Sequence, residues 1–157
     1  MKNLYYVNSP VGKLGIIEEN QKITGLFFKG VKKAPKTTAD FTMGETPLIK
    51  KTAAQLEEYF DGKRKVFDIP LFLKGTAFQQ AVWKALLRIP YGETKSYKEV
   101  ATMAGNAAAC RAAGMANNRN PVAIIVPCHR VIGADGSLTG YGGGLDKKQY
   151  LLDLEKP

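Results

Sequence analysis

The chain has few of the residues from which metal and nucleotide sites are built. Its 157 residues include two cysteines, Cys110 and Cys128, and one histidine, His129. Two thiols and one imidazole are too few for a four-coordinate zinc site, and no C-x-x-C or H-x-x-x-H spacing occurs. The glycine-rich run at residues 140–145 lacks the last glycine of G-x-G-x-x-G, and the sequence has no G-K-[ST]. We therefore expect neither a metal nor another bound cofactor.

Long hydrophobic runs are also missing. No segment approaches the length of a transmembrane helix, and polar residues and Pro10 interrupt the N-terminal segment where a secretory signal would need an apolar run. Hydrophobic residues make up 45% of the chain and charged residues 24%, close to the averages of globular proteins. The sequence therefore predicts a globular cytoplasmic protein that does not contact membranes, with both cysteines reduced.

Acidic residues are scarce relative to basic ones. The formal net charge is +9, and no acidic residue occurs between Glu99 and Asp135, where the charged residues are Arg111, Arg119 and Arg130. A surplus of this size favours a polyanionic partner, although a basic surface without such a partner is the alternative.

The first part of the chain alternates short apolar segments with turn residues. Segments 4–7, 14–17 and 23–28 read as strands of an antiparallel meander, followed by a polar loop at 30–44. Thr46 and Pro47 start a helix that runs to about Phe60, and a further strand is expected at 66–71. We place a boundary at residue 75, which gives a β-rich lobe at 1–75 and a second domain at 76–157, an α+β arrangement.

The second part is rich in alanine and reads as helical. Thr76 caps a helix that runs to about Ile89, Ser96 caps a short helix at 97–103, and another helix is expected at 107–117. Two short helices joined by a glycine-containing turn indicate a helix-turn-helix, although such pairs also occur in proteins that do not bind DNA. An apolar segment at 121–132 reads as buried and extended, and a glycine-rich turn leads to a last helix at 146–155.

Cys128 is the candidate nucleophile. A buried cysteine is most often a packing residue, but His129 and Arg130 follow this one directly, and nearby positive charge favours the nucleophilic thiolate. Neighbouring side chains on a strand point to opposite sides, so His129 would take the thiol proton through a water molecule. Glu155 could orient the imidazole from the end of the last helix, where an acid is disfavoured; from spacing alone, a solvated terminal glutamate is the favoured alternative.

These residues resemble those of the O6-alkylguanine-DNA alkyltransferases, also called methylated-DNA–protein-cysteine methyltransferases. The resemblance covers residues 76–155, and the first lobe matches in size and in a strand-rich, ribonuclease-H-like layout. The motif residues are Ser96-Tyr97, Arg111, Asn120-Pro121, Pro127-Cys128-His129-Arg130-Val131 and Tyr141-Gly142-Gly143-Gly144-Leu145.

The resemblance implies a DNA-repair reaction in which Cys128 attacks the alkyl carbon on guanine O6 and keeps the group as a thioether, so that each molecule reacts once. His129 would deprotonate Cys128 through water, Glu155 would polarise His129, and Asn120 would hold the turn that shapes the pocket. No residues correspond to the zinc ligands of some larger relatives. A tryptophan at position 128 would have indicated a lesion sensor without transfer, whereas this chain has the cysteine.

The resemblance also implies how the base is bound. Tyr97 would donate to guanine N3, the backbone N–H of Gly142 would serve O6, and the carbonyls of Cys128 and Val131 would hold the exocyclic amine. Tyr141 would line the pocket. Many relatives have a hydroxyl residue where this chain has Gly142, a change that keeps the backbone donor.

The implied partner is double-stranded DNA that contains O6-alkylguanine, bound through the minor groove by a monomer. Guanine O6 lies inside the duplex, so the nucleotide must be flipped out. Arg111 resembles the arginine that fills the resulting gap, while Ala112 and Gly114 let the helix lie close to the DNA. Ser96 is a further expected DNA contact.

Two other functions are compatible with the residues alone. One is a helix-turn-helix DNA binder in which Cys128 is idle. The other is a Cys-His hydrolase, which is the weakest reading because the chain has no second histidine to act as the base.

Overall fold

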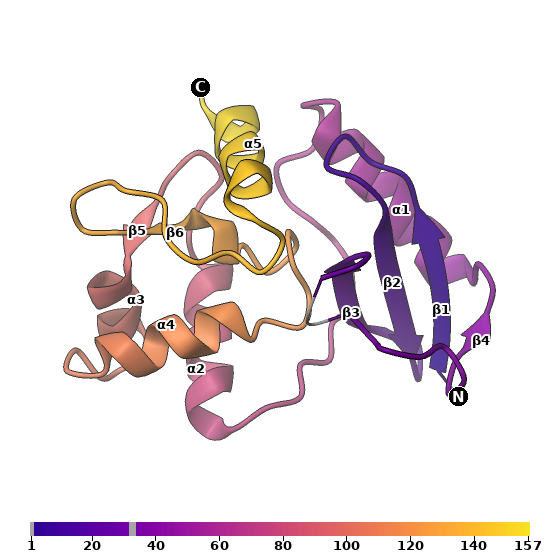
Figure 1. Ribbon diagram of the computed structural model, residues 1–157, viewed down its shortest axis with the longest axis horizontal. Helices are drawn as coiled ribbons and strands as arrows, with labels where there is room; N and C mark the ends of the chain where they lie inside the picture. Colours follow the sequence, from indigo (N-terminus) through magenta and orange to yellow (C-terminus); the bar gives the residue numbers. More distant parts are fainter. Residues whose placement is uncertain (1, 32–33) are drawn as a thin grey trace. The chain divides into compact units, whose positions relative to one another are not determined.

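The computed structural model describes residues 2–31 and 34–157, which form two compact units at 1–73 and 74–157. Figure 1 shows a sheet with one long helix in the first unit and a group of shorter helices in the second.

The first unit is built on a sheet of order β3-β2-β1-β4. The strands are β1 (Lys2–Val7), β2 (Leu14–Glu19), β3 (Lys22–Phe28) and β4 (Thr42–Met43). β2 pairs antiparallel with both β1 and β3, which confirms the predicted meander. The parallel pairing of β4 with β1 was not expected, because two residues inside a polar loop carry no periodic signal. Of the predicted loop at 30–44, residues 32 and 33 lie outside the described part.

Helix α1 (Pro47–Phe60) packs against the sheet in the first unit (Figure 1). Thr46 caps it by accepting a hydrogen bond from the Ile49 backbone N–H, and Pro47 takes the first turn, where no N–H is needed. The buried face carries Ile49, Leu56 and Tyr59. These join the buried sheet residues Leu4, Leu14, Ile16, Ile23 and Leu26 in one core.

The strand predicted at 66–71 is wrong. The segment makes only an isolated bridge, between Leu71 and Ile23. The side chain of Gln55 instead takes the backbone groups of Asp68, donating to its carbonyl at 3.3 Å and accepting from its N–H at 2.9 Å. Pro70, which has no N–H, further limits ladder formation.

The second unit contains the helices α2 (Ala77–Leu87), α3 (Tyr97–Met103), α4 (Cys110–Asn118) and α5 (Leu145–Glu155). Thr76 and Ser96 cap α2 and α3, as the sequence predicted, and the side chains of Gln79 and Glu99 complete a capping box at each. The indole of Trp83 donates to the carbonyl of Ala116 at 2.9 Å and ties α2 to α4 inside the core. Strands β5 (Lys95–Ser96) and β6 (Val131–Ile132) form a short parallel pair.

The extended segment predicted at 121–132 is also wrong for most of its length. Residues 121–126 form turns, with Ile124 at a φ of +72°, and Cys128–Arg130 form the 3-10 helix η1. The segment is buried as expected, but its flanking prolines and backbone bonds within the turns replace a ladder. Cys128 and His129 are therefore not neighbours on a strand, and the argument that they point to opposite sides does not apply.

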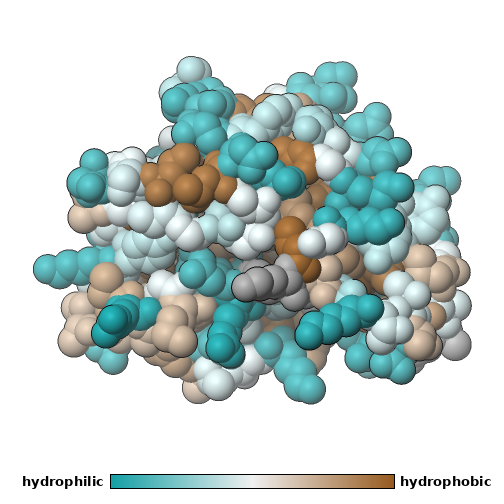
Figure 2. All heavy atoms as spheres, viewed as in Figure 1, coloured by the Kyte–Doolittle hydropathy of each residue, from teal (hydrophilic) through white to brown (hydrophobic). Residues whose placement is uncertain are grey.

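The surface in this view is mostly hydrophilic, with hydrophobic side chains in small separate groups (Figure 2). None of the helices in residues 2–31 and 34–157 has the length and hydropathy needed to cross a membrane.

Candidate active site

The turn before Cys128 is held by Asn120. The Asn120 side chain donates to the Val126 carbonyl at 2.7 Å and accepts from the Val122 N–H at 3.0 Å. Both bonds are buried, and the Val126 carbonyl also accepts from the Cys128 backbone N–H at 2.8 Å, so one amide joins the two ends of this turn. The turn delivers Cys128, which is 4% exposed, to the first position of η1.

Glu155 reaches this segment from the last residue of α5. Its Oε2 lies 2.7 Å from Nε2 of His129, and both side chains are almost completely buried. The reading of Glu155 as a solvated terminal residue is therefore wrong: it is 2% exposed. The structure thus brings together four residues to which the resemblance assigns catalytic roles: Cys128, His129, Glu155 and Asn120.

Arg130 binds the same carboxylate with two nitrogens. Its Nε donates to Oε1 of Glu155 at 2.7 Å and a terminal nitrogen donates to Oε2 at 3.0 Å. Its other terminal nitrogen donates to the carbonyl of Ile89 at 2.7 Å, just beyond α2. Because a guanidinium stays protonated, this bidentate pair keeps Glu155 as a carboxylate and neutralises its charge.

The surroundings keep His129 neutral. Burial lowers the pKa of His129, the hydrogen bond and charge of Glu155 act in the opposite direction, and the charges of Arg130 and Lys148 lower the pKa further. A neutral imidazole that donates from Nε2 to Glu155 has a lone pair on Nδ1. Nδ1 is buried and has no hydrogen-bond partner within the described residues, so it can accept a proton from a thiol or a bridging water.

The ring of Tyr91 lies against the guanidinium of Arg130. Its ring centroid lies 5.7 Å from the guanidinium carbon of Arg130, and its hydroxyl donates to the carbonyl of Leu154 at 3.2 Å. Burial and the charge of Glu155 raise the pKa of Tyr91, while Arg130 opposes them. Tyr91 therefore stays a neutral phenol that covers the ion pair.

Lys148 is a buried residue that the sequence analysis missed. It donates to the carbonyl of Val131 at 2.6 Å and to that of Thr139 at 2.8 Å. Burial lowers its pKa, and its electrostatic interaction with Cys128 opposes that shift. The spacing along the helix could have indicated its burial. Lys148, Leu151 and Glu155 lie at i, i+3 and i+7, on one face of the helix, and all three are buried.

Tyr97 and Thr139 form a second hydrogen-bonded pair. The Tyr97 hydroxyl lies 2.8 Å from Oγ1 of Thr139, and either oxygen can be the donor. The Tyr97 ring lies against Gly114 of α4, where an added Cβ would sit 3.5 Å from the ring. Thr139 was not among the expected site residues.

The other residues expected to bind the base lie on β6 and in the loop before α5. Val131 is buried, Tyr141 is half-buried and Gly142 is exposed. The amide of Asn117 donates to the carbonyl of Cys128 at 3.4 Å. The Cys128 carbonyl also accepts from the backbone N–H of Val131, and the Val131 carbonyl accepts from Lys148.

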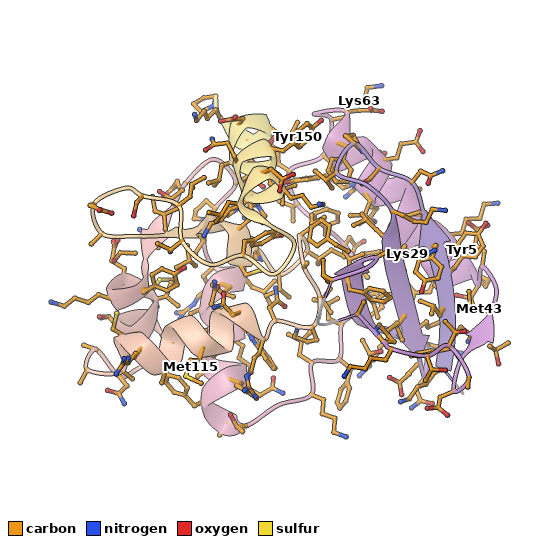
Figure 3. All side chains as sticks on the ribbon, in the orientation of Figure 1. Tyr5, Lys29, Met43, Lys63, Met115 and Tyr150 are labelled. Carbon is orange, nitrogen blue, oxygen red and sulfur yellow. The ribbon has the colours of Figure 1, made fainter. Side chains whose placement is uncertain are left out.

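The residues expected to bind DNA lie on α4 and at the start of α3. Arg111 and Ala112 are exposed and Gly114 is half-buried. Met115, 59% exposed, projects from α4 in Figure 3. The Ser96 hydroxyl accepts the capping bond from Glu99 at 3.1 Å. The ion pairs between described residues do not include Arg111, and α4 contains no acidic residue.

Known proteins match both units. The family model described as 6-O-methylguanine DNA methyltransferase, ribonuclease-like domain, matches residues 2–73, and the corresponding DNA binding domain model matches residues 77–157. The methylated-DNA–protein-cysteine methyltransferase of Methanosarcina barkeri is 49% identical over 155 residues, 98% of each chain. That of Mycobacterium tuberculosis is 49% identical over 150 residues, 96% of this chain and 90% of the relative.

Solved structures of proteins with the same description have the same fold. The crystal structure of Mycobacterium tuberculosis O6-methylguanine methyltransferase superposes with a TM-score of 0.92 at 47% identity, covering 99% of this chain and 93% of the other. The M. tuberculosis protein OGT, crystallised in complex with DNA, gives 0.89 at 47% identity and covers 98% and 92%.

Fold and matches together define the class, a two-domain methyltransferase. The chain belongs to the 6-O-methylguanine DNA methyltransferase family. The predicted family, the α+β fold and the methyltransferase class are therefore confirmed, and the hydrolase reading is set aside.

Proposed function

We propose that the protein repairs O6-alkylguanine in DNA by moving the alkyl group to Cys128, once per molecule. It is a DNA-repair methyltransferase whose acceptor is one of its own cysteines. The observation that carries the assignment to Cys128 is the 2.7 Å hydrogen bond between His129 and Glu155, buried beside a buried cysteine. The other cysteine, Cys110, is exposed on α4 and has no such neighbours.

The proton of Cys128 passes through a water molecule to Nδ1 of His129. Glu155 stabilises the imidazolium that forms, because it accepts the Nε2 hydrogen bond as a carboxylate. Lys148 adds a positive charge that interacts with Cys128, which favours the thiolate.

The thiolate sulfur then attacks the alkyl carbon. The carbon–sulfur bond forms as the bond from carbon to O6 breaks, and its electron pair stays on guanine, which takes up a proton. The thioether product resists hydrolysis under mild conditions. The protein is therefore consumed in the reaction.

The pocket recognises guanine by the residues named from the motif. Tyr97 donates to N3, the Gly142 N–H serves O6, and Tyr141 lines the pocket. The carbonyls of Cys128 and Val131 accept from the exocyclic amine, in addition to the bonds that they accept from Asn117 and Lys148 within the protein.

The helix pair α3–α4 binds double-stranded DNA from the minor groove, and the protein acts as a monomer in the cytoplasm. Arg111 enters the stack in place of the flipped nucleotide, and the small residues Ala112 and Gly114 allow close approach. Ser96, at the start of α3, contacts the backbone. The exposure of Arg111 on an acid-free helix and the DNA complex of the M. tuberculosis relative support this arrangement.

The test compares two matched variants, Cys128→Ser and Cys110→Ser, for removal of the methyl group from a duplex that contains O6-methylguanine. We expect C110S to react like the original protein and C128S to bind the duplex without reacting. Methyl transfer by C128S would refute the assignment to Cys128. So would a C110S variant that no longer transfers the methyl group.

A further inference from the structure

We propose that Thr139 is a positioning residue that directs the hydroxyl proton of Tyr97 toward guanine N3. The inference rests on the proposed function and adds a residue to it. The observation is the 2.8 Å contact between Oγ1 of Thr139 and the Tyr97 hydroxyl. The two residues are 42 positions apart and lie on different elements, the first turn of α3 and the loop between β6 and α5.

A tyrosine hydroxyl has one proton to donate and can also accept. If Tyr97 donates to Thr139, that proton is unavailable to a base. If Thr139 donates to Tyr97, the phenol proton is directed elsewhere, and a chain of bonds can run from Thr139 through Tyr97 to N3. Bonds in such a chain strengthen one another. The threonine hydroxyl can take either role, so guanine binding selects the second arrangement.

A third residue, Lys148, fixes the position of Thr139. Its carbonyl accepts from Nζ of Lys148 at 2.8 Å, and Lys148 also binds the carbonyl of Val131 at 2.6 Å. One buried ammonium thus holds both the carbonyl proposed to bind the guanine amine and the residue that orients Tyr97. On α4, a Cβ added at Gly114 would lie 3.5 Å from the Tyr97 ring, so this face of the ring looks onto α4. The hydroxyl of Tyr97 is therefore placed by α3, which carries it, and by the loop that carries Thr139 before any base arrives.

The test uses Thr139→Val, which keeps the shape and removes the hydroxyl, and Thr139→Ser, which keeps the hydroxyl. Single-turnover transfer rates are measured with duplexes that contain O6-methylguanine or its 3-deaza analogue, in which a C–H group replaces N3. On the normal lesion we expect T139V to react about fivefold more slowly, the effect of one lost hydrogen bond, and T139S to stay within about twofold.

The analogue separates positioning from packing. With no acceptor at position 3, T139V and the original protein should react at equal rates. In a Tyr97→Phe background, T139V should cause no further loss on the normal lesion. Equal rates of T139V and the original protein on O6-methylguanine would overturn the inference, as would a fivefold loss that persists on the analogue. If the original protein transferred the methyl group from neither duplex, the proposed function would be refuted, and this inference with it.

Discussion

Oε2 of Glu155 lies 2.7 Å from Nε2 of His129 and 3.0 Å from a guanidinium nitrogen of Arg130, so the two basic side chains share one carboxylate oxygen. Arg130 neutralises Glu155, which limits how far the carboxylate can raise the pKa of His129. His129 therefore remains an uncharged base while still held in one tautomer. The charges of Glu155, Arg130 and Lys148 therefore set how readily His129 and Cys128 exchange protons.

Replacing Glu155 with Gln should destabilise the protein and slow transfer. The change leaves the buried guanidinium of Arg130 without its counter-charge, and breaking a buried ion pair costs about 3 kcal/mol or more of the free energy of unfolding. Urea denaturation measures this. Asp153→Asn, which changes an exposed carboxylate on the same helix, is the matched control and should have little effect. Equal stability of E155Q and the original protein would contradict the network.

Replacing Arg130 with Met should shift the pH dependence of transfer. Without the guanidinium, the charge of Glu155 acts on His129 alone and raises the pKa of His129. The acid-side midpoint of the rate should then move to higher pH, with activity recovering as the solution is made more alkaline. The measurement is the single-turnover rate against pH, with the exposed Arg119→Met as control. A midpoint that stays in place or moves to lower pH would count against the proposed role of Arg130.

Stability should fall on mild acidification. The pKa of His129 is lowered in the folded protein, mainly by burial, so the unfolded chain binds the proton first as the pH drops below about 6.5. The contribution is complete above that pH and is lost progressively below it. His129 is the only histidine, so urea denaturation between pH 7.5 and 5.5 reports mainly on this group. Stability that rises over this acidification would disprove the neutral buried state.

Replacing Lys148 with Met should make Cys128 less reactive. The variant loses a positive charge that interacts with Cys128 and the donor that holds the carbonyls of Val131 and Thr139. Alkylation of Cys128 by iodoacetamide, followed against pH, should show a thiol that ionises at higher pH. Lys156→Met, on an exposed lysine near the end of α5, is the control. An unchanged alkylation profile in K148M would contradict the role of this charge.

Replacing Arg111 with Ala should impair repair in the duplex but not the chemistry itself. The side chain is exposed on α4, and its proposed role is to occupy the gap left by the flipped base. Transfer from a duplex should slow by at least tenfold, while reaction with free O6-methylguanine base should be unchanged. Equal slowing on both substrates would assign Arg111 to the pocket instead.

Local signals predicted much of this fold. The strands of the meander follow apolar segments between turn residues, and the helices begin at Thr46, Thr76 and Ser96 because their hydroxyl groups cap the first turn. The two wrong strands share a cause. At 66–71 and 121–126, side-chain amides of Gln55 and Asn120 take backbone groups that a ladder would need, and hydrophobicity alone does not reveal such partners.

The site was predicted in part. The motif identified Cys128, His129 and Asn120, which lie within ten residues of one another in the sequence and on one turn of the structure. The resemblance names Glu155 as the partner of His129, but its position at a helix end favours a solvated residue, because its burial depends on Arg130 and His129, more than twenty residues away. Lys148 was missed because a lysine on a helix is normally exposed. Here carbonyl groups of another segment accept its hydrogen bonds, which allows its ammonium group to be buried.

The most direct test of the account is the intact mass of the protein after reaction with excess duplex that contains O6-methylguanine, followed by peptide mapping. We expect a single methyl addition per molecule, located on the peptide that contains Cys128, with no further gain over time. Methylation of the peptide that contains Cys110, or repeated release of methyl product by unmodified protein, would contradict it.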